Sequence, residues 1–202
     1  MNAPERTDIY VVRHAHVHNP DDILYGRLPR FHLSEMGFRQ ARQLAEFLAG
    51  RSIDAIYSSP LLRARQTAAA ISRSLPGVPV HRSSLILEVF TSYQGSPNSI
   101  LKPGFSFYEP LNGEMDESMA GVYDRISRFL RGMVRRHSGR AIVAVTHADP
   151  IAIMRLGLMG QPFTVSNLHS TVYPARASIN LVTLTPRDDP VVTYFNVSGE
   201  RI

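Results

Sequence analysis

The chain has 202 residues, no cysteine and a formal net charge of +5, and 44% of its residues are hydrophobic. This length predicts a single domain over residues 1–202. The absence of cysteine excludes a disulfide framework, thiolate metal sites and a cysteine nucleophile. No apolar run approaches the ~18 residues of a membrane span, and residues 1–6 lack the features of a signal peptide, so we expect a cytoplasmic protein with no membrane partner.

The basic side chains are almost all arginines, with Lys102 as the only lysine, and they are scattered along the chain. The densest basic stretch, residues 131–140, is interpreted as a solvated helix end at which cations offset the helix dipole. Scattered arginines argue against nucleic acid as a partner. Arginine also binds phosphate and carboxylate groups through paired hydrogen bonds, so an anionic substrate stays open.

Hydrophobic patterns predict strands that alternate with helices along the chain. Strands are expected at residues 9–12, 55–57, 85–87 and 141–145, followed by 178–184 and 191–197 with a turn at 186–190 between them. Helices are expected from Ser34 to Gly50, from 61 to 75, from 119 to 133 and from 150 to 154. Ser59-Pro60 and Asp149-Pro150 are interpreted as capping pairs of the second and fourth helices. This order predicts an α/β fold, a three-layer sandwich with a mainly parallel central sheet flanked by helices.

One long segment, at about residues 88–114, carries no clear pattern of helix or strand. It is rich in Gly, Pro and Ser, and it contains the aromatic residues Phe90, Tyr93, Phe105, Phe107 and Tyr108. Segments of this length inside a compact domain are typically lids or binding loops. We therefore interpret residues 88–114 as an inserted lid that determines specificity.

Polar residues follow the predicted strands in a consistent way. They are Arg13-His14 after the first strand, Ser58-Ser59-Pro60 leading to Arg63 after the second, Glu88 after the third and Thr146-His147 after the fourth. Ligands bind beyond the carboxyl ends of the strands in open α/β sheets. Helix N-termini at the same edge add positive dipole ends. The sequence therefore predicts a phosphate pocket at this edge.

These residue types match the needs of phosphoryl transfer without an obligatory metal or cofactor. A neutral imidazole can attack phosphorus, while guanidinium groups and a second, protonated imidazole stabilise the charge on the transferring oxygens. The leaving oxygen needs a proton, which a partly buried carboxylic acid can supply. Glu88 is the candidate general acid/base, and Glu109, Glu114 and Asp116 are alternative acids.

Several ordered segments also carry a family resemblance. They are residues 11–15, 33–41 and 58–68, Glu117-Ser118 with Arg125, and residues 145–148. These segments resemble the histidine phosphatase superfamily, also called phosphoglycerate mutase-like. The sequence departs from the family pattern at Ala15, His16 and Ala148, and again in residues 89–95.

The resemblance implies a role for each pocket residue. It makes His14 the phosphorylated nucleophile, Glu88 the proton donor, and Arg13, Arg63 and His147 the rest of the phosphate pocket. Asn19 stands one position nearer to His14 than the asparagine common in the family, and we include it as a phosphate contact. The expected substrate is a small-molecule phosphomonoester or a phosphoprotein, and the sequence does not indicate the oligomeric state.

Three alternatives to a phosphatase stay open. One is phosphoryl transfer of the phosphoglycerate mutase type, although mutases of this superfamily are typically longer. Another is a metal-dependent hydrolase, because His14, His16 and His18 alternate along the chain and would point to one face of a strand. The last is a non-catalytic module that binds a phosphorylated ligand.

Overall fold

The computed structural model describes residues 6–186 and 188–199. Most of the N-terminal stretch considered for a signal peptide, and Arg187 of the predicted turn at 186–190, therefore lie outside the described residues. None of the described helices is long and apolar enough to cross a membrane.

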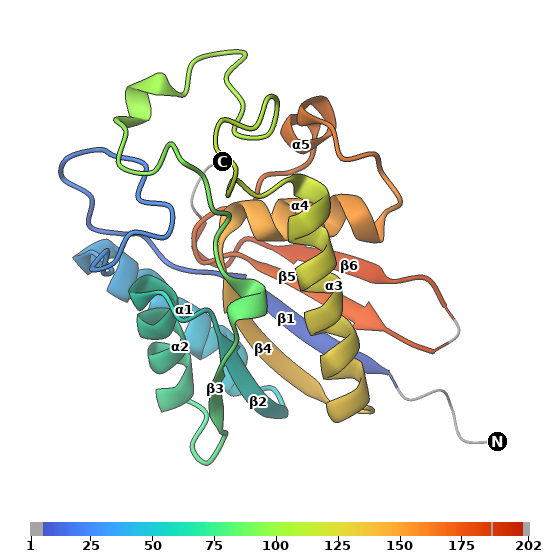
Figure 1. Ribbon diagram of the computed structural model, residues 1–202. Coiled ribbons are helices and arrows are strands. Elements are labelled where there is room, and N and C mark those ends of the chain that lie inside the picture. Colours follow the sequence, from blue (N-terminus) through green and yellow to red (C-terminus); the bar gives the residue numbers. More distant parts are fainter. Residues whose placement is uncertain (1–5, 187, 200–202) are drawn as a thin grey trace.

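A six-stranded sheet forms the centre of the molecule (Figure 1). Its strands are β1 (Thr7–Arg13), β2 (Ile53–Ser58), β3 (Val80–Arg82), β4 (Ala141–Thr146), β5 (Ile179–Leu184) and β6 (Val191–Phe195). They lie in the order β3-β2-β4-β1-β5-β6. β1 to β4 run parallel, whereas β5 and β6 are antiparallel to their neighbours. The predicted mainly parallel sheet is therefore confirmed.

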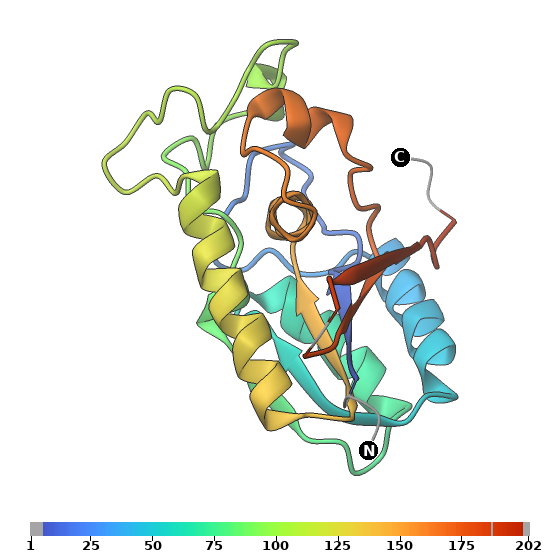
Figure 2. The same cartoon turned by 90° about the vertical axis from the view of Figure 1, so that its right-hand side faces the viewer.

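Helices cover both faces of this sheet. They are α1 (Glu35–Ala49), α2 (Leu62–Arg73), α3 (Met119–Arg136), α4 (Ala148–Leu158) and α5 (Val165–Ser170), with single 3₁₀ turns at Ser84–Ile86 and Asn98–Ile100. Figure 2 shows α3 and α1 on opposite sides of the strands. Within β1, Ile9 and Val11 join the core under α3 and α4, whereas Val12 joins the core under α1 and α2. This alternation produces the predicted three-layer sandwich.

The third predicted strand is wrong. Residues 84–86 form a 3₁₀ turn, and the strand is β3, at Val80–Arg82, which pairs in parallel with β2. All three residues of β3 are exposed, so this edge strand has no hydrophobic alternation to detect.

Both predicted capping pairs are also wrong. α2 begins at Leu62 rather than next to Ser59. α4 begins at Ala148 with His147 as its N-cap residue, so Asp149 lies within the first turn, and the helix continues beyond 154 to Leu158.

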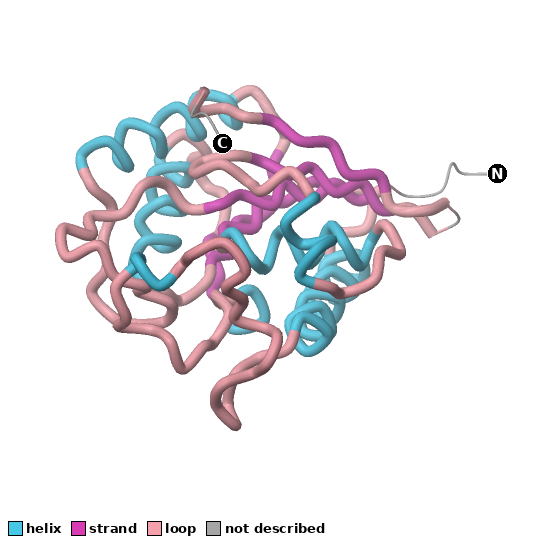
Figure 3. Tube along the Cα trace, turned by 90° about the horizontal axis from the view of Figure 1, so that it is seen from above, coloured by secondary structure: helices cyan, strands magenta, loops and turns pink. Residues whose placement is uncertain are grey.

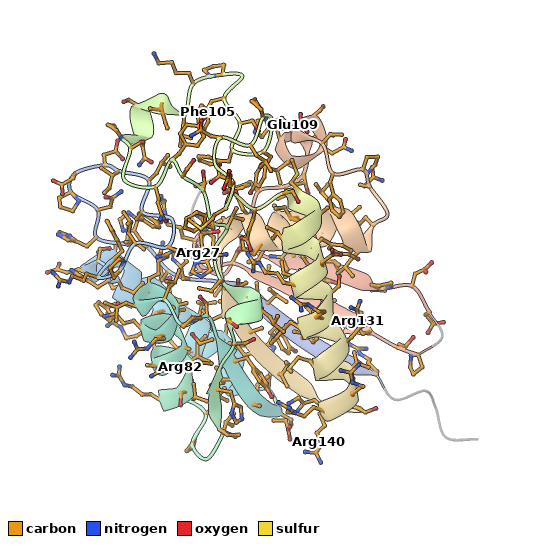
Figure 4. The ribbon with its side chains drawn as sticks, viewed as in Figure 1. Arg27, Arg82, Phe105, Glu109, Arg131 and Arg140 are labelled. Carbon is orange, nitrogen blue, oxygen red and sulfur yellow. The ribbon has the colours of Figure 1, made fainter. Side chains whose placement is uncertain are left out.

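The basic stretch at residues 131–140 is only partly a solvated surface. Arg131, within α3, and Arg140, between α3 and β4, are exposed, and Figure 4 labels both. His137 is buried instead, and its ring lies between the Asp54 carboxylate, which contacts Nδ1, and the Tyr57 hydroxyl, 2.9 Å from Nε2. The interpretation of this histidine as solvated is therefore wrong.

Candidate active site

The carboxyl ends of three neighbouring strands bring the predicted pocket residues together. Arg13 of β1 is level with Thr146 of β4, and Ser58 of β2 is level with Val145 of β4. The backbone N–H of the residue after β1, His14, extends this pairing by donating to the Thr146 carbonyl at 2.9 Å. The residues after β1, β2 and β4 therefore emerge at one edge, which Figure 3 views from the side covered by loops.

The His14 ring is buried and held in one tautomer. Its Nδ1 lies 2.8 Å from the Ala15 carbonyl, which only accepts hydrogen bonds, so Nδ1 carries the proton. Nε2 therefore keeps its lone pair, and it accepts a hydrogen bond from Arg63 Nε at 3.1 Å. Burial, and then the charge of Arg63, hold the pKa of His14 well below its usual range. The ring is therefore neutral at pH 7, with its proton on Nδ1.

Arg63 lies in the first turn of α2, and its side chain is almost fully buried. One Nη donates to the Gly26 carbonyl at 2.7 Å, and the guanidinium lies 4.7 Å from the centre of the Tyr25 ring. The Thr67 hydroxyl donates to the Arg63 carbonyl at 2.9 Å and accepts from the backbone N–H of Ala15 at 3.2 Å. These contacts fix the guanidinium against the loop that follows β1.

Glu88 faces both Arg63 and His147. Its Oε2 lies 3.9 Å from Arg63 Nη2 and 3.7 Å from His147 Nδ1. Burial, with the nearby charge of Asp149, raises the pKa of Glu88 to about 7. This value lets the side chain both donate and accept a proton at neutral pH.

The His147 ring is fully buried and lies edge-on to His14, with 5.1 Å between the ring centres. Its Nε2 is 2.8 Å from Ser59 Oγ, and its Nδ1 has no hydrogen-bond partner within the described residues. Burial, then Arg63, lower the pKa of His147 well below its usual range. The second imidazole is therefore neutral at pH 7, in contrast to the protonated ring expected from the sequence.

Arg125, in α3, holds the backbone that carries Glu88. Its Nη1 donates to the carbonyls of Leu85 and Leu87 at 3.0 and 2.8 Å, and its Nη2 lies 3.3 Å from the Glu88 carbonyl. Nε and Nη2 of the same guanidinium bind both carboxylate oxygens of Glu117. We call this set of contacts the Arg125 clasp.

Arg27 completes the clasp from the loop after β1. Its Nε donates to the Glu88 carbonyl at 2.7 Å, and its Nη2 binds Glu117 at 2.7 Å. Figure 4 places Arg27 below Phe105 and Glu109 of residues 88–114, the segment that the sequence predicts to be a lid and that we call the lid segment. The clasp thus joins this loop, the lid and α3 behind the acid.

A cleft of about 690 Å³ opens over these groups. Arg13 and Asn19 line it, together with His14 and Glu88. Arg13 Nη1 donates to the Pro174 carbonyl at 2.6 Å, and the Asn19 amide exchanges two hydrogen bonds with the backbone of Ile23. The contacts of Arg13 and Asn19 with phosphate stay predictions.

The profile of the histidine phosphatase superfamily, branch 1, matches residues 9–197. The chain belongs to this superfamily. A relative from Mycobacterium tuberculosis, the uncharacterised protein Rv0525, is 34% identical over an alignment of 168 positions, and the match covers 78% of this chain and 81% of the relative. Phosphoserine phosphatase 1 of Hydrogenobacter thermophilus is 32% identical over 164 aligned positions, and the match covers 75% of this chain and 76% of that protein.

Solved structures share the fold of this histidine phosphatase. The phosphoserine phosphatase of Entamoeba histolytica, in complex with 3-phosphoglyceric acid, is 25% identical and has a TM-score of 0.76. The match covers 93% of this chain and 95% of that chain. The predicted superfamily, and with it the class of hydrolases that act on phosphomonoesters, is confirmed.

The alternative acids have other surroundings in this histidine phosphatase. Glu109 and Glu114 are exposed and do not line the cleft. The buried carboxylate of Asp116 accepts hydrogen bonds from the backbone N–H groups of Ser92 and Gly113. Asp116 therefore joins two parts of the lid segment.

The alternating histidines are not gathered into one site. His16 Nδ1 lies 2.8 Å from Ser34 Oγ, and the His18 ring stacks on His32 with 5.1 Å between centres. Over residues 6–186 and 188–199, the His/Asp/Glu group with suitably close ligand atoms is His14, Glu88 and His147, all within 4.8 Å of one another. The predicted alternative site at His14, His16 and His18 is therefore not formed.

That closer group is a poor cation site. The lone pair of His14 Nε2, the atom that would bind a metal, already accepts from the guanidinium of Arg63. A fixed positive charge at this distance repels a cation and attracts an anion. The arrangement therefore fits a phosphate group better than a metal ion.

Asp149 is a residue of the candidate site that the sequence interpretation missed, because it was assigned only to capping. Ser59 was named among the polar residues that follow the strands, but it too was given only a capping role. In the structure Ser59 contacts His147, while Asp149 accepts a hydrogen bond at 2.6 Å from each of the Tyr108 and Tyr173 hydroxyls. The position of Ser59 directly after β2 is a signal in the sequence, whereas Asp149 lies in the first turn of α4 and has no comparable signal.

Proposed function

We propose that this phosphatase hydrolyses phosphomonoesters through a phosphohistidine intermediate on His14. The observation that carries the proposal is the buried pair of His14 Nε2 and Arg63 Nε, 3.1 Å apart, with Glu88 facing the same point. A neutral imidazole whose Nε2 carries no proton, beside a guanidinium that binds the phosphoryl oxygens, has the composition of a phosphoryl-transfer site.

The first step transfers the phosphoryl group to the enzyme. His14 Nε2 attacks phosphorus with its lone pair, and the bond from phosphorus to the ester oxygen breaks. The protonated carboxyl of Glu88 gives its proton to that oxygen, so the alcohol leaves neutral. Arg63 and the N–H of His147 stabilise the phosphoryl oxygens, and the N-terminus of α4 adds its positive dipole end.

The second step regenerates the enzyme. The Glu88 carboxylate takes a proton from water, and the water oxygen attacks phosphorus while the bond between phosphorus and nitrogen breaks. Inorganic phosphate leaves, and both His14 and Glu88 return to their starting protonation states. No step requires a metal ion.

The first prediction is that His14→Ala abolishes phosphate release, with phenyl phosphate as the substrate. When the wild type reacts with a radiolabelled phosphate ester and the reaction is stopped rapidly without acid, a labelled phosphoenzyme should be trapped. The label should be stable in base and labile in acid, as in a phosphoramidate. The variant should trap none. His81→Ala, which removes an exposed imidazole from β3, is the matched control and should keep full activity.

The alternatives give different results in the same assays. A metal-dependent hydrolase would lose activity to a chelator and regain it with zinc, whereas we expect no change. A binding module would bind inorganic phosphate without turnover. A mutase would interconvert phosphoglycerates faster than it releases phosphate, and that result would replace hydrolysis as the proposed reaction.

A further inference from the structure

A second cavity, of about 600 Å³, lies beside the cleft that contains His14. It is bounded by lid residues 101–108, by α5 and by the first turn of α4. Four residues line both cavities, and they are Leu101, Phe107, Asp149 and Tyr173. The two cavities therefore adjoin each other and share part of their lining.

The walls of this second cavity are mainly apolar. Phe105, Phe107 and Tyr108 come from the lid, and Val165 and Leu168 come from α5. The phenylalanines pack edge to face with 5.2 Å between ring centres, which gives the lid a fixed shape without helix or strand. The volume lies within the 300–1,000 Å³ typical of small-molecule sites.

Asp149 marks the boundary between the two cavities. One carboxylate oxygen accepts from Tyr108 of the lid and the other from Tyr173, each at 2.6 Å. These bonds hold the lid and the segment after α5 against the first turn of α4. The negative charge also disfavours an anionic group at this point.

The direction of phosphoryl transfer relates the second cavity to the reaction. The leaving oxygen lies opposite the attacking nitrogen in such a transfer, so the alcohol extends away from His14 and past Glu88. Glu88, Asp149, Phe107 and Tyr173 line the same cleft. The alcohol therefore extends toward the wall that the second cavity shares.

We propose that the second cavity is a subsite for the leaving group, and that the substrates are phosphomonoesters of alcohols with an extended apolar or aromatic body. This inference rests on the proposed phosphatase function. It specifies the substrate by the chemistry of the cavity: no charge next to the ester oxygen, and an apolar chain or ring long enough to pass Asp149.

A series of n-alkyl phosphates from ethyl to octyl tests the subsite. The leaving alcohols of this series have nearly equal pKa values, so differences in kcat/KM report on binding of the chain. Burial of each methylene should raise kcat/KM by about two- to fourfold until the cavity is filled. A flat series, with phenyl phosphate still hydrolysed through His14, overturns the subsite and leaves the proposed function intact.

Two substitutions on α5 provide a matched comparison. Val165→Trp adds bulk to the cavity wall, whereas Ser166→Trp adds the same bulk at an exposed position that does not line it. We expect Val165→Trp to remove the dependence on chain length while ethyl phosphate is hydrolysed as in the wild type. Ser166→Trp should retain the dependence.

Phe105→Ala removes a wall of the same cavity without adding bulk, and it also should weaken the dependence on chain length. An unchanged slope in both Val165→Trp and Phe105→Ala would place the alkyl chain elsewhere and overturn the proposal. If the wild type does not hydrolyse phenyl phosphate, that result would instead contradict the proposed function.

Discussion

At the scale of single residues, environment separates Glu88 from the other acids of the lid. Glu109 and Glu114 are exposed, whereas the Glu88 carboxyl is packed between Arg63 and His147, and its pKa rises to about 7. The type of residue alone did not distinguish these acids in the sequence. Glu88 lies two residues after Ile86, the buried residue of the turn Ser84–Ile86, and this position places it in the site.

Replacement of Glu88 by Gln should affect substrates according to their leaving groups. An alkyl phosphate needs protonation of its leaving oxygen, so its rate of phosphoryl transfer should fall by about 10²–10⁴-fold. A nitrophenolate leaves with little protonation, so 4-nitrophenyl phosphate should be affected far less. Single-turnover rates with ethyl and 4-nitrophenyl phosphate measure the difference. Glu109→Gln is the control, and an equal loss for both substrates in Glu88→Gln would assign the proton to another group.

At the scale of secondary structure, α3 and α4 approach each other closely at Gly157. A Cβ added there would lie 2.1 Å from the ring of Tyr123 in α3. α4 also carries His147 at its N-cap, so the spacing of the two helices supports the site.

Gly157→Ala should therefore destabilise the protein by about 1–3 kcal/mol, as other substitutions that overfill a core do. Gly132→Ala in α3 is the matched control, because its added methyl group meets nothing within 4 Å. That control should be neutral or stabilising by up to about 1 kcal/mol, the helix preference of alanine over glycine. Urea unfolding midpoints measure both, and a Gly157→Ala variant as stable as Gly132→Ala would show that the tyrosine ring moves aside freely.

Sequence patterns predicted the buried elements well, because burial of one face of a helix or strand requires regularly spaced hydrophobic residues. The apolar spacing of 119–133 and the run at 141–145 correspond to α3 and β4. The exposed strand β3 has no such period, and the 3₁₀ turn at 84–86 resembles a strand because it contains Leu85 and the buried Ile86. Local patterns therefore fail where an element is short and its role depends on distant neighbours.

In the candidate site, too, local sequence patterns predicted some residues and failed for others. Residues that follow buried strands, such as His14 and His147, were predicted because the parallel sheet brings strand ends together. Asp149 was not, because its partners Tyr108 and Tyr173 are 41 and 24 residues away in the chain. Only tertiary structure distinguishes a helix cap from a cleft residue at such a position.

At the scale of the whole molecule, buried ionisable groups make stability depend on pH. The pKa values of His14 and His147 are lowered below the ordinary 6.5, so as the pH falls through 6.5 the unfolded chain takes up protons on both rings that the folded chain does not. Stability is therefore lost as the pH falls. Glu88 acts in the opposite direction, because its folded pKa of about 7 exceeds the ordinary 4.5 and its contribution is lost as the pH rises from 4.5 to 7.

The two histidines outweigh the single glutamate between pH 5 and 6. The net difference of one proton should lower the free energy of unfolding by about 1.4 kcal/mol per pH unit on acidification. Glu88→Gln removes the opposing group, so for this variant the change of unfolding free energy with pH should approach the value expected for a difference of two protons. Urea unfolding at several pH values measures both slopes. A wild-type stability that rises on acidification would show that the rings titrate normally in the folded state, and a slope that Glu88→Gln does not steepen would show that Glu88 does.

The Arg125 clasp has a consequence for how this enzyme can diversify. Arg125 and Arg27 bind the carbonyl oxygens of residues 85, 87 and 88, and every amino acid has such a carbonyl. Mutations that change the side chains at 85 and 87 therefore leave these anchoring bonds available. Side chains at the approach to the lid segment can therefore be exchanged during evolution while the backbone at Glu88 keeps its position.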